Sequence, residues 1–150
     1  MKKTLVKFLA TGTYLGYSPV MPGTFGTLWG IPLAWYADGL GLQGKILLFS
    51  VVFLASVYIA GECCRILGKH DPGSIVIDEV CGYLVSFAFI PFTLANAILI
   101  FLLFRFFDIL KPYPVRLIDR KVKGGSGVVI DDVAAGIYAN ISAHIILRFF

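Results

Sequence analysis

Residues 80–104, VCGYLVSFAFIPFTLANAILIFLLF, form an uncharged run of 25 residues with Pro91 near its middle. A helix needs about 20 apolar residues to cross the hydrocarbon of a bilayer, so this run is long enough for one crossing. Proline in a helix interior removes a hydrogen bond and kinks or breaks the helix. The alternative to one crossing is a re-entrant hairpin of two half-length helices, which returns the chain to the side on which it entered.

The charges on either side of this run favour the hairpin. Residues 62–79 and 105–132 hold eight of the nine acids and eight of the thirteen basic residues. The second segment carries six Lys or Arg residues and the amino terminus carries three, so the positive-inside rule places both in the cytoplasm. A hairpin that breaks near Pro91 keeps the two charged segments together on that side.

Composition supports a membrane protein of one domain, residues 1–150. The chain is 58% hydrophobic and only 15% charged, with a mean hydropathy of +0.85, whereas soluble domains have about a quarter of charged residues. A chain of this length cannot enclose that much apolar surface in its own interior. The high hydrophobic content also excludes disorder. The net charge of +4 comes from interleaved acids and bases, which excludes a nucleic-acid binder and fits anionic lipid headgroups. Cys63, Cys64 and Cys81 form no Cys-x-x-Cys pair, so we expect reduced core residues.

Three other uncharged runs are expected to be helical. Residues 46–61 and 133–147 are short, and residues 8–37 are rich in Gly and Pro until about Thr27. Signals for strands or hairpin turns are poor. We therefore predict an all-α fold, a compact membrane-embedded helical bundle with short or broken transmembrane helices and a site that faces the cytoplasm.

Two doublets of acids stand where a polar segment meets an apolar run. Asp78-Glu79 belong to HDPGSIVIDEVCG (70–82), and Asp131-Asp132 to KGGSGVVIDDVAAG (123–136). Carboxylates at the edge of hydrocarbon are costly unless they are paired or bind a cation. The structural alternative is a helix amino terminus, whose dipole favours acids. The recurrence of the doublets favours hard oxygen ligands for Mg²⁺.

Basic residues that suit phosphate accompany these acids. In FRFFDILKPYPVRLIDRK (104–121), Arg105, Asp108 and Lys111 recur at three-residue spacing and face one another on a helix, and Arg116 and Asp119 follow on a second helix. Arg and Lys bind phosphate, although a solvated amphipathic surface helix would have the same pattern. Elsewhere, Gly124 and Gly125 could direct backbone amides at an anion, and Thr24 in SPVMPGTFGTLWGIP (18–32) could line a phosphate or lipid pocket. Plain turns are the alternative for both.

Four blocks, in order and at their spacing, resemble the phosphatidylglycerophosphatase A family: SPVMPGTFGT, HDPGSIVIDE with Gly82, FRFFDILKPYP with Arg116 and Asp119-Arg120, and GGSG through IDDVAAG. The resemblance covers the chain from Gly12 to about Asn140. It implies an all-α, Mg²⁺-dependent enzyme of the bacterial inner membrane, multi-pass, that removes the terminal phosphate of phosphatidylglycerophosphate to give phosphatidylglycerol.

The predicted site combines these residues. Asp78, Glu79, Asp131 and Asp132 would hold one or two Mg²⁺ ions, and Asp78, Asp108, Lys111 and Asp131 would be catalytic. The phosphate would be bound by Arg105, Lys111, Arg116, Thr24, Gly124 and Gly125. Both a metal-activated water and Asp78 are candidate nucleophiles. A phosphatidyltransferase is disfavoured because its Asp-Gly-x-x-Ala-Arg helix is missing, while a membrane cation-binding or ion-conducting protein remains the alternative. Membrane lipid is an expected partner, and the chain could self-associate.

Overall fold

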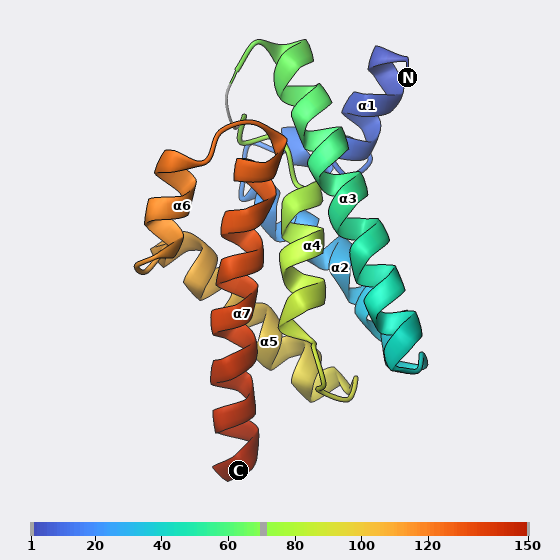
Figure 1. Cartoon of the computed structure of the whole chain (residues 1–150), viewed down its shortest axis with the longest axis vertical. Helices are drawn as coiled ribbons and strands as arrows, with labels where there is room; N and C mark the ends of the chain where they lie inside the picture. The colour runs from blue at the N-terminus through green and yellow to red at the C-terminus, as the bar shows by residue number, and fades with distance from the viewer. Residues whose placement is uncertain (1, 70–71, 150) are drawn as a thin grey trace.

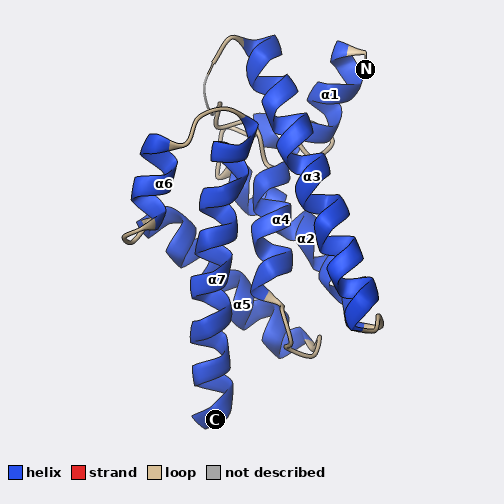
Figure 2. Ribbon diagram, in the orientation of Figure 1, coloured by secondary structure: helices blue, strands red, loops and turns tan. Residues whose placement is uncertain are grey.

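A computed structural model describes residues 2–69 and 72–149. Within these ranges the chain forms seven α-helices and one short 3₁₀ helix, and no strand (Figures 1 and 2). They are α1 (Lys3–Ala10), η1 (Leu15–Tyr17), α2 (Pro22–Asp38), α3 (Leu42–Leu67), α4 (Ile77–Ser86), α5 (Leu94–Leu110), α6 (Val115–Lys121) and α7 (Gly125–Phe149). The predicted all-α fold is confirmed.

Helix α4 lies at the centre of the bundle. It packs most extensively against α7, and also against α2, α3 and α5 (Figure 1). Tyr83 on α4 is fully buried, and its hydroxyl donates a hydrogen bond of 3.0 Å to the carbonyl of Ala97 on α5. The Tyr83 ring also meets Phe104 edge to face. Helix α4 has only ten residues, but neighbouring helices cover nearly all of its faces, so it sets their relative positions.

The run at residues 80–104 is broken as predicted. Helix α4 ends at Ser86, α5 begins at Leu94, and residues 87–93, which include Pro91, are not helical. Asn140 on α7 donates hydrogen bonds of 3.0 and 2.8 Å to the carbonyls of Ser86 and Ala88, which satisfies backbone groups that the break exposes. The two arms bring the ends of the run together, because Glu79 and Arg105 lie 3.8 Å apart.

Three helices are longer than the sequence predicts. Helix α2 begins at Pro22 rather than near Thr27, α3 has 26 residues rather than the 16 of the apolar run, and α7 has 25 and begins within the glycine-rich segment. Proline is tolerated in a first helical turn, and charged residues continue a helix beyond its apolar part. Helices α3 and α7 are long and apolar enough to cross a membrane.

Small residues let the central helices approach closely. A Cβ atom on Gly82 of α4 would lie 2.6 Å from the carbonyl oxygen of Asp132 on α7, and one on Gly136 would collide with the carbonyl of Gly82. Packing of helices through small residues is typical of membrane proteins. This contact sets the distance between the two acid doublets. Cys63 and Cys81 are buried as expected, and no disulfide joins the three cysteines, all of which the structure describes.

Candidate active site

One polar cavity of about 310 Å³ lies where the amino ends of α4 and α7 meet the carboxyl end of α5. It collects side chains from both acid doublets and from the basic segment. The lining consists of Met21, Pro22, Gly23, Gly73, Ile75, Asp78, Glu79, Arg105, Asp108, Ile109, Lys111, Asp131 and Asp132. The structure therefore unites all four predicted metal ligands and three of the predicted residues from the basic segment.

Three carboxylates form the acidic centre of this cavity. One oxygen from each of Asp78, Glu79 and Asp132 lies within 4.8 Å of the others, and only 7% of Asp78 and 4% of Asp132 is exposed. Within the described part of the chain, Glu79 Oε2 and Asp132 Oδ2 are buried with no hydrogen-bond partner. Burial raises the pKa of Glu79 to about 8; a hydrogen bond with Asp78 opposes this rise, the charges of Asp132 and Asp108 add to it, and Arg105 opposes it. Unsatisfied oxygens of this kind are the ligands that a hard divalent cation requires.

The helix dipole does not account for both doublets. Asp78 and Glu79 stand in the first turn of α4, where the dipole favours negative charge. Asp131 and Asp132 are instead the seventh and eighth residues of α7, beyond the reach of its amino terminus. The second doublet therefore needs another source of stabilisation, which a cation and Lys111 would provide.

Lys111 binds the remaining acid of the doublets. It is the residue that ends α5, in the left-handed conformation (φ 44°), and this directs its side chain back to the cavity. Its Nζ donates hydrogen bonds of 2.6 Å to Asp131 Oδ2 and 2.9 Å to Asp119 Oδ1. Burial opposes the charge of Lys111, but the hydrogen bonds and charges of the two aspartates outweigh it and raise the Lys111 pKa above its usual value. Lys111 is therefore a fixed cation, and its partner Asp131 is not one of the three carboxylates whose oxygens group within 4.8 Å.

Arg105 supplies the second cation. Its Nη1 donates a hydrogen bond of 2.6 Å to Asp108 Oδ2, as the three-residue spacing predicts, and lies 3.8 Å from Glu79 Oε1. Gly23, in the first turn of α2, faces this pair: a Cβ atom there would collide with Glu79 Oε1 and come within 2.8 Å of Arg105 Nη1. Gly23 is not among the site residues that the sequence predicts, although its neighbour Thr24, in the same SPVMPGTFGT block, is.

Four predicted phosphate ligands lie outside the cavity lining. Arg116 donates a hydrogen bond to the carbonyl of Leu110, and the Thr24 hydroxyl is buried without a hydrogen-bond partner in the described residues. Gly124 precedes α7 with a φ of +79°, and Gly125 packs against Val57 and Gly61 of α3. Gly124 and Gly125 therefore begin a helix and pack it against its neighbour. His70 and Asp71, in the first acidic block, lie outside the described residues.

Asp119 is the other site residue that the sequence does not predict. Its spacing indicates only the charged face of a surface helix. Its contact with Lys111 comes from a different helix, α6, which the turn at residues 111–114 folds back toward α7. Nothing in the sequence spacing indicates that contact.

A family model and two of the relatives found by comparison with known proteins carry the same name. The family model described as Phosphatidylglycerophosphatase A matches residues 8–147. A Haemophilus influenzae protein named Phosphatidylglycerophosphatase A is 41% identical over 138 residues, which cover 91% of this chain and 85% of that protein. The Escherichia coli protein of the same name is 37% identical over 139 residues, covering 92% and 79%. A Bacteroides thetaiotaomicron protein named Putative phosphatidylinositol-3-phosphatase is 35% identical over 142 residues, covering 89% and 87%. No solved structure matches the chain.

Proposed function

Because the chain belongs to the phosphatidylglycerophosphatase A family of phosphatases, we propose that it hydrolyses phosphatidylglycerophosphate to phosphatidylglycerol and phosphate with the help of Mg²⁺. The observation that carries this proposal is the cavity itself. There, three buried carboxylates face the two fixed cations, Arg105 and Lys111. All five residues belong to the sequence blocks that resemble the family.

The three-carboxylate group fits a divalent ion. Asp78, Glu79 and Asp132 would hold Mg²⁺, which prefers oxygen ligands and takes few of them from protein. When bound, the ion supplies positive charge to a phosphate oxygen and makes water a better nucleophile. Since Asp78 belongs to this group, we assign the attack to water rather than to Asp78. Asp131 was predicted as a fourth ligand, and its hydrogen bond from Lys111 favours a different role, that of orienting Lys111.

The basic residues would bind the phosphate. The guanidinium of Arg105 and the ammonium of Lys111 both line the cavity, where they can donate charge-assisted hydrogen bonds to phosphate oxygens. Asp108 orients Arg105 through its hydrogen bond of 2.6 Å. Asp131 and Asp119 orient Lys111 from two helices. Each phosphate-binding cation thus has a carboxylate that fixes its side chain before substrate arrives, which reduces the entropic cost of ordering it.

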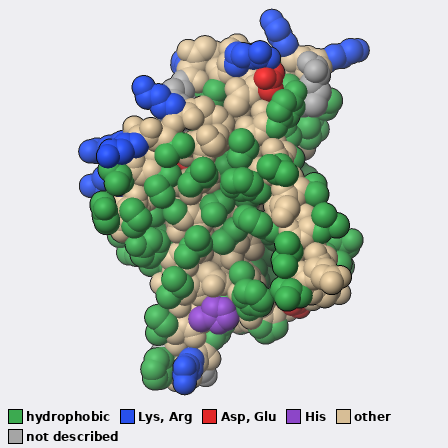
Figure 3. Space-filling model, viewed as in Figure 1, with side chains coloured by type: hydrophobic (Ala, Val, Ile, Leu, Met, Phe, Trp, Pro, Cys, Tyr) green, Lys and Arg blue, Asp and Glu red, His purple; other side chains and the backbone are tan. Residues whose placement is uncertain are grey.

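If the cavity lies at the membrane surface, the phosphate of a lipid can reach it. Large apolar side chains cover the middle of the molecule, and Lys and Arg gather at the end formed by α1, α6 and the amino end of α7 (Figure 3). An exposed apolar surface of this extent fits lipid contact. We propose that α3 and α7 cross the bacterial inner membrane and that the basic end, with the cavity, faces the cytoplasm. The phosphate would then be met at the membrane surface, with the acyl chains left in the bilayer.

Phosphate release from phosphatidylglycerophosphate in detergent tests the proposal. We expect activity in Mg²⁺, loss of at least about 100-fold in EDTA, and recovery when Mg²⁺ is restored. Phosphatidylinositol 3-phosphate, suggested by the name of the Bacteroides relative, is the comparison substrate and should be cleaved more slowly. Equal rates with and without EDTA would refute the metal site, and no release from the first substrate would refute the assigned reaction.

A further inference from the structure

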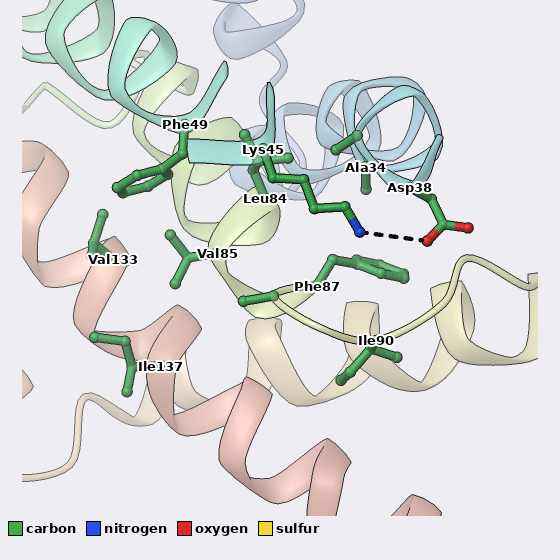
Figure 4. A pocket seen from close by; sticks show the side chains of 12 residues that line it. Ala34, Asp38, Lys45, Phe49, Leu84, Val85, Phe87, Ile90, Val133 and Ile137 are labelled. Atoms are coloured by element: carbon green, nitrogen blue, oxygen red, sulfur yellow. Dashed lines mark ion pairs between the residues drawn. The ribbon is translucent and has the colours of Figure 1, made fainter. Parts of the chain in front are cut away.

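A second cavity, away from the site described above, is almost entirely apolar. We call it the apolar groove: it has a volume of about 350 Å³ and lies among the carboxyl ends of α2 and α4, the amino end of α3 and the middle of α7 (Figure 4). Ala34, Phe49, Leu84, Phe87 and Ile137 are among its walls. It shares no lining residue with the polar cavity. Both candidate membrane-crossing helices border it, so it would be accessible to lipid.

The charged residues at the groove are Lys45 and Asp38. Lys45 extends from α3 toward Asp38 on α2, with 3.9 Å between Nζ and Oδ1, and about a third of each side chain is exposed (Figure 4). A pair this long and exposed is weak. Lys45 therefore remains available to an anion, and its aliphatic stem lies along the apolar wall.

Lys45 lies in the first turn of α3, and the amino end of α3 is at the end of the bundle opposite to the amino ends of α4 and α7, where the polar cavity lies (Figure 1). Twenty residues separate it from Arg65 on α3, and at 1.5 Å per residue they span about 30 Å, the thickness of bilayer hydrocarbon. If α3 crosses the membrane, Lys45 lies at the headgroups of the far leaflet, and the groove lies in the hydrocarbon next to them. A lipid whose phosphate is at Lys45 cannot place that phosphate in the polar cavity.

We propose that the apolar groove binds an acyl chain of an anionic phospholipid of the leaflet opposite the active site, with the headgroup phosphate at Lys45. This proposal rests on the membrane position proposed above but not on the reaction. The lining of the groove is almost wholly apolar apart from Lys45 and Asp38, so an acyl chain in the groove would leave its phosphate next to Lys45. The positive charge of Lys45 favours an anionic headgroup.

Native mass spectrometry of the full chain, purified without lipid and then mixed with phosphatidylserine or phosphatidylcholine, tests the proposal. Phosphatidylserine is anionic without being the product of the proposed reaction. We expect the protein to retain one phosphatidylserine under washing that removes phosphatidylcholine. Ile137→Trp, which fills the groove from α7, and Lys45→Ala should each reduce retention at least tenfold. Ile141→Trp changes a similarly exposed isoleucine one turn further along α7, outside the groove, and Arg148→Ala removes another cation of the far end; both should retain lipid as the wild type does.

Activity separates this lipid from substrate. Phosphate release by Ile137→Trp should stay within about twofold of wild type; a tenfold rise in KM would show that the groove holds the acyl chain of the substrate and would overturn the proposal. Equal retention by Ile137→Trp and wild type, or no retention by the wild type, would also overturn it. If Ile137→Trp does not fold, Ala37→Phe fills the groove from α2. Loss of phosphate release with lipid retention intact would count against the proposed function alone.

Discussion

Among the described residues, Lys111 and Arg105 are the two basic side chains in the lining of the polar cavity, and each is fixed by acids. Lys111→Ala and Arg105→Ala should therefore each lower kcat/KM by at least about 100-fold, or about 2.7 kcal/mol of transition-state stabilisation. Arg120→Ala and Lys121→Ala change basic residues of α6 outside that lining and should lower it less than about threefold. Phosphate release by the four variants measures this ranking, and a reversed ranking would mean that the wrong basic face has been assigned.

Asp119 acts through Lys111, so its removal should be milder than removal of Lys111 itself. Lys111 keeps its hydrogen bond to Asp131 when Asp119 is lost, and we expect Asp119→Ala to lower kcat/KM about tenfold, or about 1.4 kcal/mol. Asp119→Glu keeps the carboxylate and should recover most of the activity at an unchanged melting temperature. Glu62→Gln, which removes an acid from an exposed pair with Arg65, is the matched control and should behave as wild type. No rescue by Asp119→Glu would argue against a positioning role.

At the scale of the helices, the contact between α4 and α7 is the feature on which the site depends most. Gly82→Ala and Gly136→Ala place a methyl group against a backbone carbonyl of the other helix. Overpacking of this kind costs about 1–3 kcal/mol, which for a chain of this size corresponds to a fall in Tm of roughly 2–12 °C. Because the same contact places Asp132 beside Asp78, activity should fall as well.

Thermal unfolding in detergent checks this effect. Gly41→Ala is the control, because no atom lies within 4 Å of the added methyl group and the Gly41 backbone (φ −66°) suits alanine. An unchanged Tm for both Gly82→Ala and Gly136→Ala would contradict the claim that close approach of α4 and α7 is required.

The sequence predicts the hairpin well because its cause is local. Pro91 removes a helical hydrogen bond within the run, and the positive charge near residues 80–104 favours a position of both ends on one side of the membrane. Helix lengths are predicted less well. Pro22 and the glycines of α2 and α7 suggested loops, but in the fold they are tolerated in a first turn or needed for close packing, which only the neighbouring helices reveal.

In the site, too, local features are predicted from the sequence and contacts between distant helices are not. The acid doublets and the Arg105–Asp108 pair are predictable from the sequence. Adjacent acids beside an apolar run indicate a cation site, and a three-residue spacing on a helix indicates an ion pair. The partners of Lys111 are eight and twenty residues away, so they depend on how α6 and α7 fold back. For the same reason the sequence could not separate Asp131, which Lys111 binds, from Asp132, which joins the other carboxylates.

At the scale of the whole molecule, the hairpin makes a prediction about the membrane. Ser74 precedes α4 and Ser126 lies in the first turn of α7, so both belong to the end of the bundle that carries the polar cavity. Single cysteines at these positions, in a background without the three native ones, should be labelled from the cytoplasmic face only. Gln43→Cys, at the exposed start of α3, should be labelled from the opposite face. Labelling of Ser74→Cys and Ser126→Cys from opposite faces would contradict the proposed topology.

The central claim, that the buried carboxylates are the metal-binding part of a lipid phosphatase, is tested most directly by phosphate release from conservative variants. Asp78→Asn, Glu79→Gln and Asp132→Asn keep the shape of each side chain and remove its charge, and Asp131→Asn does the same for the partner of Lys111. In proteins shown to be folded by an unchanged elution profile and Tm, each should lose at least about 100-fold in kcat/KM toward phosphatidylglycerophosphate. Wild-type rates in any two of these variants would contradict the account.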